Sequence, residues 1–120
     1  MVSATTGNRY PDSIPATWLA DRLAVDPVKI DVMRRSGELI AVREPGSIEW
    51  RYPAWQFDNG KPRRGVARVV AAAREAGIDE ARLYVVLTAP LGLRESGRRR
   101  LVDLLLEGRE DEVVAAVRAA

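Results

Sequence analysis

Neither cysteine nor histidine occurs in this 120-residue sequence. Disulfide bonds, thiolate nucleophiles, zinc fingers and imidazole acid–base catalysis are therefore excluded from the chain. The sequence also lacks an apolar run near the roughly 20 residues that a membrane-spanning helix needs. Its first residues show neither the charged start nor the apolar stretch of a signal peptide. These absences lead us to expect a cytoplasmic protein without a membrane partner.

A large excess of charge of one sign is absent too, because 19 Lys and Arg residues stand against 17 Asp and Glu residues. The distribution of these charges is more informative than their sum. Residues 59–74 contain no acid, whereas residues 101–117 contain several acids and a single arginine. We interpret the basic patch either as a phosphate-binding surface or as a solvated helix start. It consists of Lys61, Arg63, Arg64 and Arg68.

The first half of the chain has the pattern of a helix-turn-helix. One face of a first predicted helix, over residues 17–25, is apolar and consists of Trp18, Leu19, Leu23 and Val25. Asp26 is a suitable N-cap for the next helix, and Pro27 suits its first position. The second helix is therefore predicted from Pro27 to Arg35, and Gly37 ends it.

A two-stranded wing is predicted after this helix. Residues 39–43 are rich in strand-forming side chains, and residues 45–47 have the composition of a turn. Residues 48–52 alternate apolar and charged side chains, which is typical of a returning strand.

The segments WLADRLAVDPVKIDVMRRSGELIAVR and RYPAWQFD resemble the winged helix-turn-helix of the MerR/excisionase type. The resemblance implies that the second helix enters the major groove and that the wing contacts the neighbouring backbone. Ile30 and Met33 would then face the core. The residues expected at DNA are Thr17, Val28, Lys29, Asp31, Val32, Arg35, Arg43 and Arg51, together with Lys61, Arg63 and Arg64 of the basic patch.

The second half is predicted to be helical. Residues 66–73 have one apolar face, and Gly77 ends that helix. Asp79 is the expected N-cap of a helix over residues 80–87. Two further amphipathic helices are indicated by Leu101, Leu104 and Leu105, and by Val113, Val114 and Val117.

The segment LYVVLTAPLGLRESGRRRLVDLLLEGREDEVVAAVRAA resembles the C-terminal toxin-binding domain of the MbcA/ParS/Xre antitoxins, and YPAWQFDNGKPRRGV resembles the linker before it. The resemblance implies that this domain docks into the active site of a RES-domain toxin that degrades NAD. It also implies that the helix-turn-helix represses the operon shared by toxin and antitoxin.

Partner contacts are expected in the last third of the chain. Winged helix-turn-helix proteins usually bind palindromic operators as dimers, and the predicted dimer surface consists of Leu105, Leu106, Val113 and Val117. The interpretations of Arg98, Arg99 and Arg100 are phosphate contacts, pairing with a partner's carboxylates, or exposure to solvent. We favour solvent, because a helix N-terminus repels extra positive charge that water does not screen.

Catalysis is not expected. The carboxylate pairs Asp103 with Glu107 and Glu107 with Asp111 have the composition of a solvated helix face rather than of an acid–base site. The sequence has no phosphate-binding glycine loop, no metal-ligand spacing and no nucleophile with a partner base, so we expect neither cofactor nor metal.

The aromatic residues are interpreted as either core or base-stacking groups. Core packing is predicted for Trp18, Trp55 and Phe57, because few other large side chains are available there. For Trp50 and Tyr52 both interpretations stay open. If they face inward, Arg51 between them faces outward.

The expected fold is α+β and mostly α, with a flexible N-terminus over residues 1–13, a winged helix-turn-helix over residues 14–60 and a small helical bundle over residues 61–120. The expected function is that of a DNA-binding transcriptional regulator, an antitoxin-like repressor that acts as a homodimer, with a RES-domain toxin as a further partner. The alternative is a protein-binding adaptor or toxin-neutralising module without sequence-specific DNA binding. Asp31 favours the alternative, since phosphates repel a carboxylate that accepts no cytosine amino group.

Overall fold

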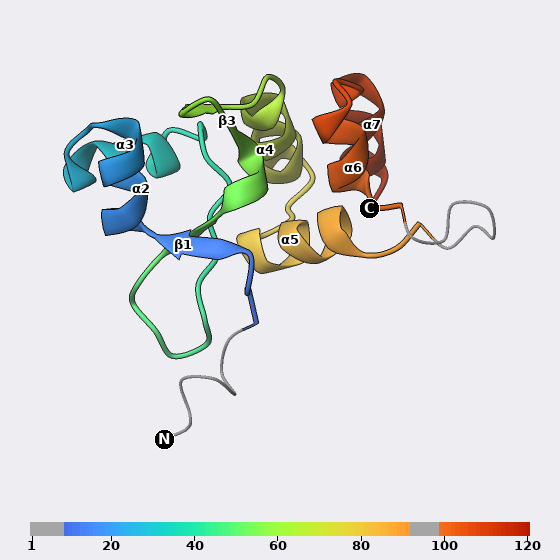
Figure 1. The fold of residues 1–120 in the computed structure, drawn as a ribbon. Coiled ribbons are helices and arrows are strands. Elements are labelled where there is room, and N and C mark those ends of the chain that lie inside the picture. The colour runs from blue at the N-terminus through green and yellow to red at the C-terminus, as the bar shows by residue number, and fades with distance from the viewer. Residues whose placement is uncertain (1–8, 92–98) are drawn as a thin grey trace.

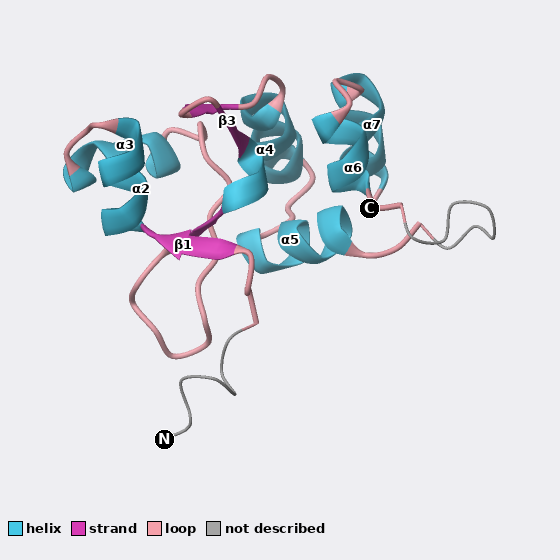
Figure 2. Ribbon diagram, in the orientation of Figure 1, coloured by secondary structure: helices cyan, strands magenta, loops and turns pink. Residues whose placement is uncertain are grey.

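The computed structural model describes residues 9–91 and 99–120 and has an α+β fold that is mostly helical (Figure 1, Figure 2). This confirms the predicted fold class. No helix in these two ranges is both long enough and apolar enough to cross a membrane. The helices are α2 (Ala16–Leu23), α3 (Pro27–Arg35), α4 (Val66–Glu75), α5 (Glu80–Thr88), α6 (Leu101–Leu106) and α7 (Glu110–Ala119), with a short 3-10 helix η1 (Ala54–Gln56). The strands are β1 (Ser13–Pro15), β2 (Arg51–Pro53), β3 (Phe57–Asp58) and β4 (Lys61–Pro62).

The helix-turn-helix forms where its local signals predict it. After α2 the chain turns at Ala24, which has a left-handed conformation with φ 58°. The Asp26 carboxylate then accepts a hydrogen bond of 2.9 Å from the backbone N–H of Val28. This N-cap fixes the start of α3 at Pro27, as expected. The direction in which α3 leaves the turn therefore follows from a few neighbouring residues.

The predicted wing is only partly strand. Its two segments pair at one position, where Val42 and Arg51 exchange two backbone hydrogen bonds of 2.8 Å. The first segment does not form a longer ladder, because the N–H and C=O groups of Ile40 both bind the side-chain amide of Gln56. A backbone whose polar groups are already satisfied has none left for a second strand.

Strand β2 pairs instead with β1, which precedes the helix-turn-helix. The two strands are antiparallel, and Ile14 lies opposite Tyr52. Strands β3 and β4 form a second small antiparallel pair, with Asp58 opposite Lys61. Within residues 9–91 and 99–120 the strands therefore form two short pairs rather than one wing of two full strands.

Residues 10–13 are packed against the protein, so the expectation of a flexible chain up to this point was wrong for them. Tyr10 is buried, and its ring packs edge-on against Tyr84 with 4.7 Å between the ring centres. The Asp12 carboxylate accepts hydrogen bonds of 2.7 Å from the Trp55 indole N–H and from the Tyr84 hydroxyl. Burial, followed by this carboxylate, raises the pKa of Tyr84. The hydroxyl therefore remains a donor, and this segment joins α5 to the first half of the molecule.

The apolar side chains form two cores that meet at residues 39–41. Leu39 and Ala41 belong to the N-terminal core, whereas Ile40 between them belongs to the C-terminal core. This alternation is expected of an extended chain. The N-terminal core also contains Leu19, Ala20, Ile30, Met33 and Tyr52. The C-terminal core also contains Val66, Val69, Val70, Leu83, Leu87, Leu101, Leu104, Leu105, Val113, Val114 and Val117.

The predictions for the aromatic residues have mixed outcomes. Trp55 and Phe57 pack against the cores as predicted, and Tyr52 is buried. Trp18 is 66% exposed, so its prediction as a core residue was wrong. The reason is geometric: Leu19, one residue and about 100° further around α2, is the side chain that faces the core.

The predicted dimer surface is also corrected. Leu105, Val113 and Val117 are buried in the C-terminal core of their own chain. The bundle uses these three side chains for its own packing, against α4 and α5 as well as each other's helices. Of the predicted set, Leu106 is the exposed residue.

Candidate nucleic-acid interface

One side of α3 is buried and the other is exposed. Ile30 and Met33 point into the N-terminal core, as predicted. Val28 and Val32, four residues apart, are 69% and 50% exposed. The charged residues on the accessible part of the helix are Lys29, Asp31 and Arg35.

The Asp31 carboxylate is paired with two arginines of its own helix. It forms an ion pair with Arg34, three residues along, and a second with Arg35, where the Nη2–Oδ2 distance is 2.6 Å. The hydrogen bond from Arg34, together with the charges of both arginines, lowers the pKa of Asp31. The carboxylate is therefore ionised at neutral pH, and both of its oxygens are engaged within α3.

Trp50 connects α3 to the loop of residues 43–50. The guanidinium carbon of Arg34 lies 4.4 Å from the centre of the Trp50 ring, and that of Arg43 lies 4.5 Å from it. Cations at this distance are attracted to the indole ring. Trp50 therefore positions Arg43 near the end of α3.

The loop of residues 43–50 projects from the protein beyond β1 (Figure 1). Within it the Ser47 hydroxyl accepts a hydrogen bond of 3.0 Å from the backbone N–H of Glu49. Arg43 and Ile48 are exposed. The loop therefore has one exposed cation, Arg43, and one exposed apolar side chain, Ile48, together with two acids, Glu44 and the exposed Glu49.

Arg51 does not face outward as expected. Its Nε donates a hydrogen bond of 3.0 Å to the Ser13 hydroxyl, and its Nη2 donates one of 2.8 Å to the Ser13 carbonyl. The half-buried guanidinium therefore holds β2 to β1. Thr17, by contrast, is exposed at the start of α2 beside Trp18.

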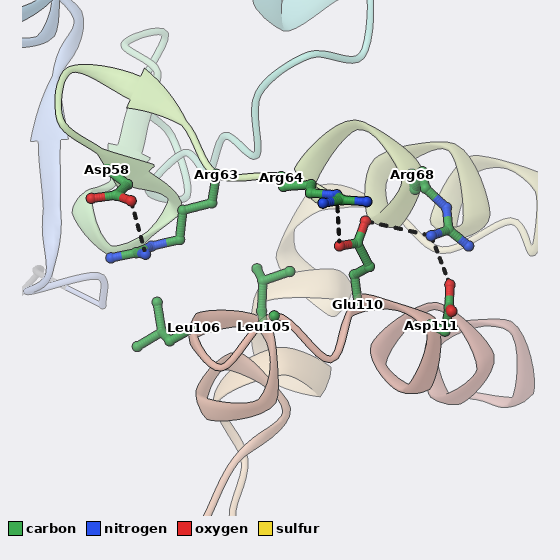
Figure 3. Close-up of a pocket in the computed structure, with 9 residues that line it drawn as sticks. Asp58, Arg63, Arg64, Arg68, Leu105, Leu106, Glu110 and Asp111 are labelled. Carbon is green, nitrogen blue, oxygen red and sulfur yellow. Dashed lines mark hydrogen bonds and ion pairs between the residues drawn. The ribbon is translucent and has the colours of Figure 1, made fainter.

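Acidic residues of α7 pair with the basic patch (Figure 3). The Glu110 carboxylate lies 3.4 Å from Arg64 and 3.5 Å from Arg68, and Asp111 lies 2.7 Å from Arg68. These acids follow the patch by some forty residues, so the acid-free run of residues 59–74 gives no sign of them; Glu110 lies 42 positions after Arg68. Arg64 and Arg68 remain exposed in these pairs, and Lys61 is exposed on β4.

Residues of the patch and of α6 line a pocket of about 410 Å³, whose walls include Leu105 and Leu106 (Figure 3). Arg63 lines the pocket and is half-buried. Its Nε donates a hydrogen bond of 2.8 Å to the Trp55 carbonyl, and its Nη1 lies 3.9 Å from Asp58. Three arginines and three carboxylates line this pocket. Its formal charge is therefore balanced, and it has no excess of cations for phosphate.

The arginines at positions 98–100 pair within the chain where they are described. Arg98 lies outside the described residues. Arg99 Nη2 lies 2.5 Å from Glu107 Oε2, and this contact lowers the pKa of Glu107. The backbone N–H of Arg100 donates a hydrogen bond of 2.8 Å to Asp103, the third residue of α6. Both described arginines are half-buried, so the expectation that they lie free in solvent was wrong.

The stacking of Arg43 on Trp50 was not predicted, because it depends on the register of the hairpin, which the structure shows. The single pair of Val42 with Arg51 places residues 43 and 50 opposite each other in an antiparallel register. Opposite residues of a hairpin are neighbours. An arginine opposite a tryptophan therefore predicts a cation–π contact.

Comparison with known protein families finds no matching family model, and comparison with curated proteins finds no match either. Among solved structures, the chain is similar to Rv2175c, whose structure was determined by NMR. The TM-score is 0.77 at 24% sequence identity, over 91% of this chain and 82% of that one. At this identity the similarity establishes a shared fold.

Proposed function

We propose that the protein binds double-stranded DNA, with α3 in the major groove. The observation that carries the proposal is the exposed side of α3, where Lys29 and Arg35 accompany two solvent-facing valines while Ile30 and Met33 anchor the opposite side. An α-helix fits the major groove of B-DNA. A helix held by one face, with cations on the other, suits that groove.

The loop of residues 43–50 supports the same proposal. Arg43 is exposed and stacked on Trp50, which also stacks with Arg34 at the end of α3. A cation beside a recognition helix is well placed for a phosphate next to the groove, and such contacts fix the orientation of the protein on the duplex. Because Trp50 already orders the arginine, less side-chain entropy is lost on binding.

Salt dependence of duplex binding tests the proposal. Replacing Lys29 and Arg35 together with alanine should weaken binding to any duplex. It should also reduce the slope of log K against log salt by about 2, one unit for each phosphate contact removed. Fluorescence anisotropy of a labelled duplex at several salt concentrations measures both quantities. Absence of salt-sensitive binding by the wild type would favour the protein-binding adaptor.

A matched control removes two exposed arginines elsewhere. Arg82 lies on α5 and Arg118 on α7, both in the second half of the molecule. The double alanine variant at these positions changes the net charge by the same amount as the test variant. It should leave the slope near that of the wild type. Equal slopes for the two double variants would mean that α3 is not the binding surface.

A second expected result concerns the acid on α3. Asp31→Asn removes a negative charge next to Arg34 and Arg35. We expect tighter binding to every duplex, about two- to fivefold, which is the scale of one exposed charge pair. The same anisotropy titration measures it. If Asp31 instead accepts a hydrogen bond from a cytosine, the variant would lose affinity for some sequences and gain none.

We further propose that a homodimer of this protein binds a palindromic operator and thereby regulates transcription in the cytoplasm. An antitoxin role with a RES-domain toxin rests on the resemblance of residues 83–120.

Since Leu105, Val113 and Val117 are buried, any partner of α6 would contact Leu106, which is exposed. Sedimentation of the wild type and of Leu106→Glu, with and without duplex, tests the dimer: only the wild type should bind as two copies.

A further inference from the structure

Val28 and Val32 form an exposed apolar pair on α3. Residues four apart on a helix are neighbours on one side, and these two are 69% and 50% exposed. The N-terminal core does not use them, because Ile30 and Met33 supply the buried side of the helix. On the DNA-facing side proposed above, this valine pair lies where base edges would be.

The polar residues between the two valines are Lys29 and Asp31, and Asp31 does not compete for bases. Both oxygens of Asp31 are engaged by Arg34 and Arg35. Among the exposed groups on the central turn of α3, the valine methyls are therefore the apolar ones. Among base edges in the major groove, the apolar feature is the C5-methyl group of thymine.

We propose that the valine pair makes α3 selective for thymine, through contacts between valine methyl groups and thymine C5-methyl groups. The inference rests on the proposed DNA-binding function and names the bases that the same site reads. Val28 and Val32 are separated by about 6 Å along the helix axis. Base pairs are spaced about 3.4 Å apart, so the two thymines lie within about two steps of each other.

Charge favours DNA over a second copy of the chain as the occupant of this surface. The accessible part of α3 has Lys29 and Arg35 near the valine pair, and the helix as a whole has three basic residues against one acid. Two copies packed through this face would bring like charges together. Phosphates on both sides of a major groove neutralise the same cations.

The test begins with a duplex enriched from a random-sequence pool by binding to the full-length protein. Each thymine of that duplex is then replaced in turn by deoxyuridine, which removes only the C5-methyl group. For the wild type, deoxyuridine at one or two neighbouring positions should weaken binding about fourfold. This factor corresponds to about 0.8 kcal/mol, the free energy of burying one methylene-sized group. Replacement elsewhere in the duplex should have no effect.

Serine variants assign the effect to the valines. Val28→Ser and Val32→Ser remove the methyl groups while keeping a similar helix propensity. Each variant should abolish the response to deoxyuridine at one position. Val85→Ser is the matched control, because Val85 is a 52% exposed valine on α5. It should retain the full response.

Three results would overturn the inference. If the enriched duplex binds but no deoxyuridine weakens it, thymine is not read, although DNA binding stands. If the pool yields no preferred sequence despite salt-sensitive binding, thymine is likewise not read and DNA binding stands. If no duplex binds at low salt, the proposed function itself fails and the inference fails with it.

Discussion

Replacing Gln56 with alanine should lower the free energy of unfolding by about 3–5 kcal/mol, from the sum of a cavity and unsatisfied polar groups. The side chain is 0% exposed. Its Oε1 accepts a hydrogen bond of 2.7 Å from the Ile40 N–H. Its Nε2 donates to the carbonyls of Ile40 at 2.7 Å and of Pro53 at 3.0 Å. Alanine would leave these backbone groups buried without partners.

Urea denaturation followed by circular dichroism measures this loss. A loss below about 1 kcal/mol would mean that water or a backbone shift replaces the amide, since an unsatisfied buried group normally costs more. An exposed change such as Arg82→Ala serves as the reference and should alter stability little.

Gln56→Glu separates the hydrogen bonds from the shape of the side chain. An ionised carboxylate keeps the acceptor for the Ile40 N–H but places negative charge beside two carbonyl oxygens. Burial raises the pKa of such a carboxyl in the folded state. The destabilisation should therefore be smallest below the unfolded-state pKa of about 4.3 and grow as the pH rises above it. Equal destabilisation at pH 4 and pH 7 would contradict this account.

Gly65→Ala should also destabilise strongly, by about 2–4 kcal/mol, because a backbone cost of about 1–2 kcal/mol is added to a steric clash. Gly65 is the N-cap residue directly before α4 and has φ +93°, a conformation that side chains disfavour. An added Cβ would lie 2.7 Å from the Cβ of Glu110. Since that atom is attached to the backbone of α7, the helix itself would have to move.

Gly77→Ala is the control for this variant. Gly77 has a similar φ of +74°, but nothing lies within 4 Å of the position of an added Cβ. It should show only the backbone cost, about 1 kcal/mol. Thermal unfolding of both variants measures the difference between them. If the two lose the same stability, the close approach of α7 to Gly65 contributes nothing.

The elements that could be predicted from sequence are those with local causes. The Asp26 cap and Pro27 determine the start of α3 within a few residues, and Asp79 caps α5 in the same way by accepting from the Arg82 N–H at 2.8 Å. The buried positions of α3 follow from helical periodicity alone. These signals need no knowledge of the rest of the chain.

The unpredicted features arise from contacts between distant residues. The side-chain amide of Gln56 binds the backbone N–H and C=O of Ile40, 16 residues earlier, so the strand-like sequence around Ile40 forms no β-ladder. Glu110 pairs with Arg68 across 42 residues, so a basic run lies beside an acidic helix. Asp12 reaches Tyr84 across 72 residues, so a segment expected to be flexible is packed. Periodicity and propensity contain no information about such partners.

The candidate site could be predicted only in part, for the same physical reason. Helical spacing alone places Lys29, Val32 and Arg35 on the accessible side of α3. The ion pairs of Asp31 with Arg34 and Arg35 were not predicted. The two arginines follow Asp31 by three and four residues, which is the spacing of ion pairs within a helix. The partner of Arg51 has no such local sign in the sequence. Ser13 belongs to β1, which precedes the helix-turn-helix, 38 positions before Arg51.

The alternation of Leu39, Ile40 and Ala41 between the two cores has a consequence for inheritance. A gene fusion at residue 60 would carry Ile40 and Gln56 with the N-terminal half. The new C-terminal half would then need an apolar space shaped for Ile40 and a surface that accepts Tyr10 and Asp12. Recombination at that point would rarely satisfy these demands, so the two halves of this protein are expected to be inherited as one unit rather than exchanged as separate modules.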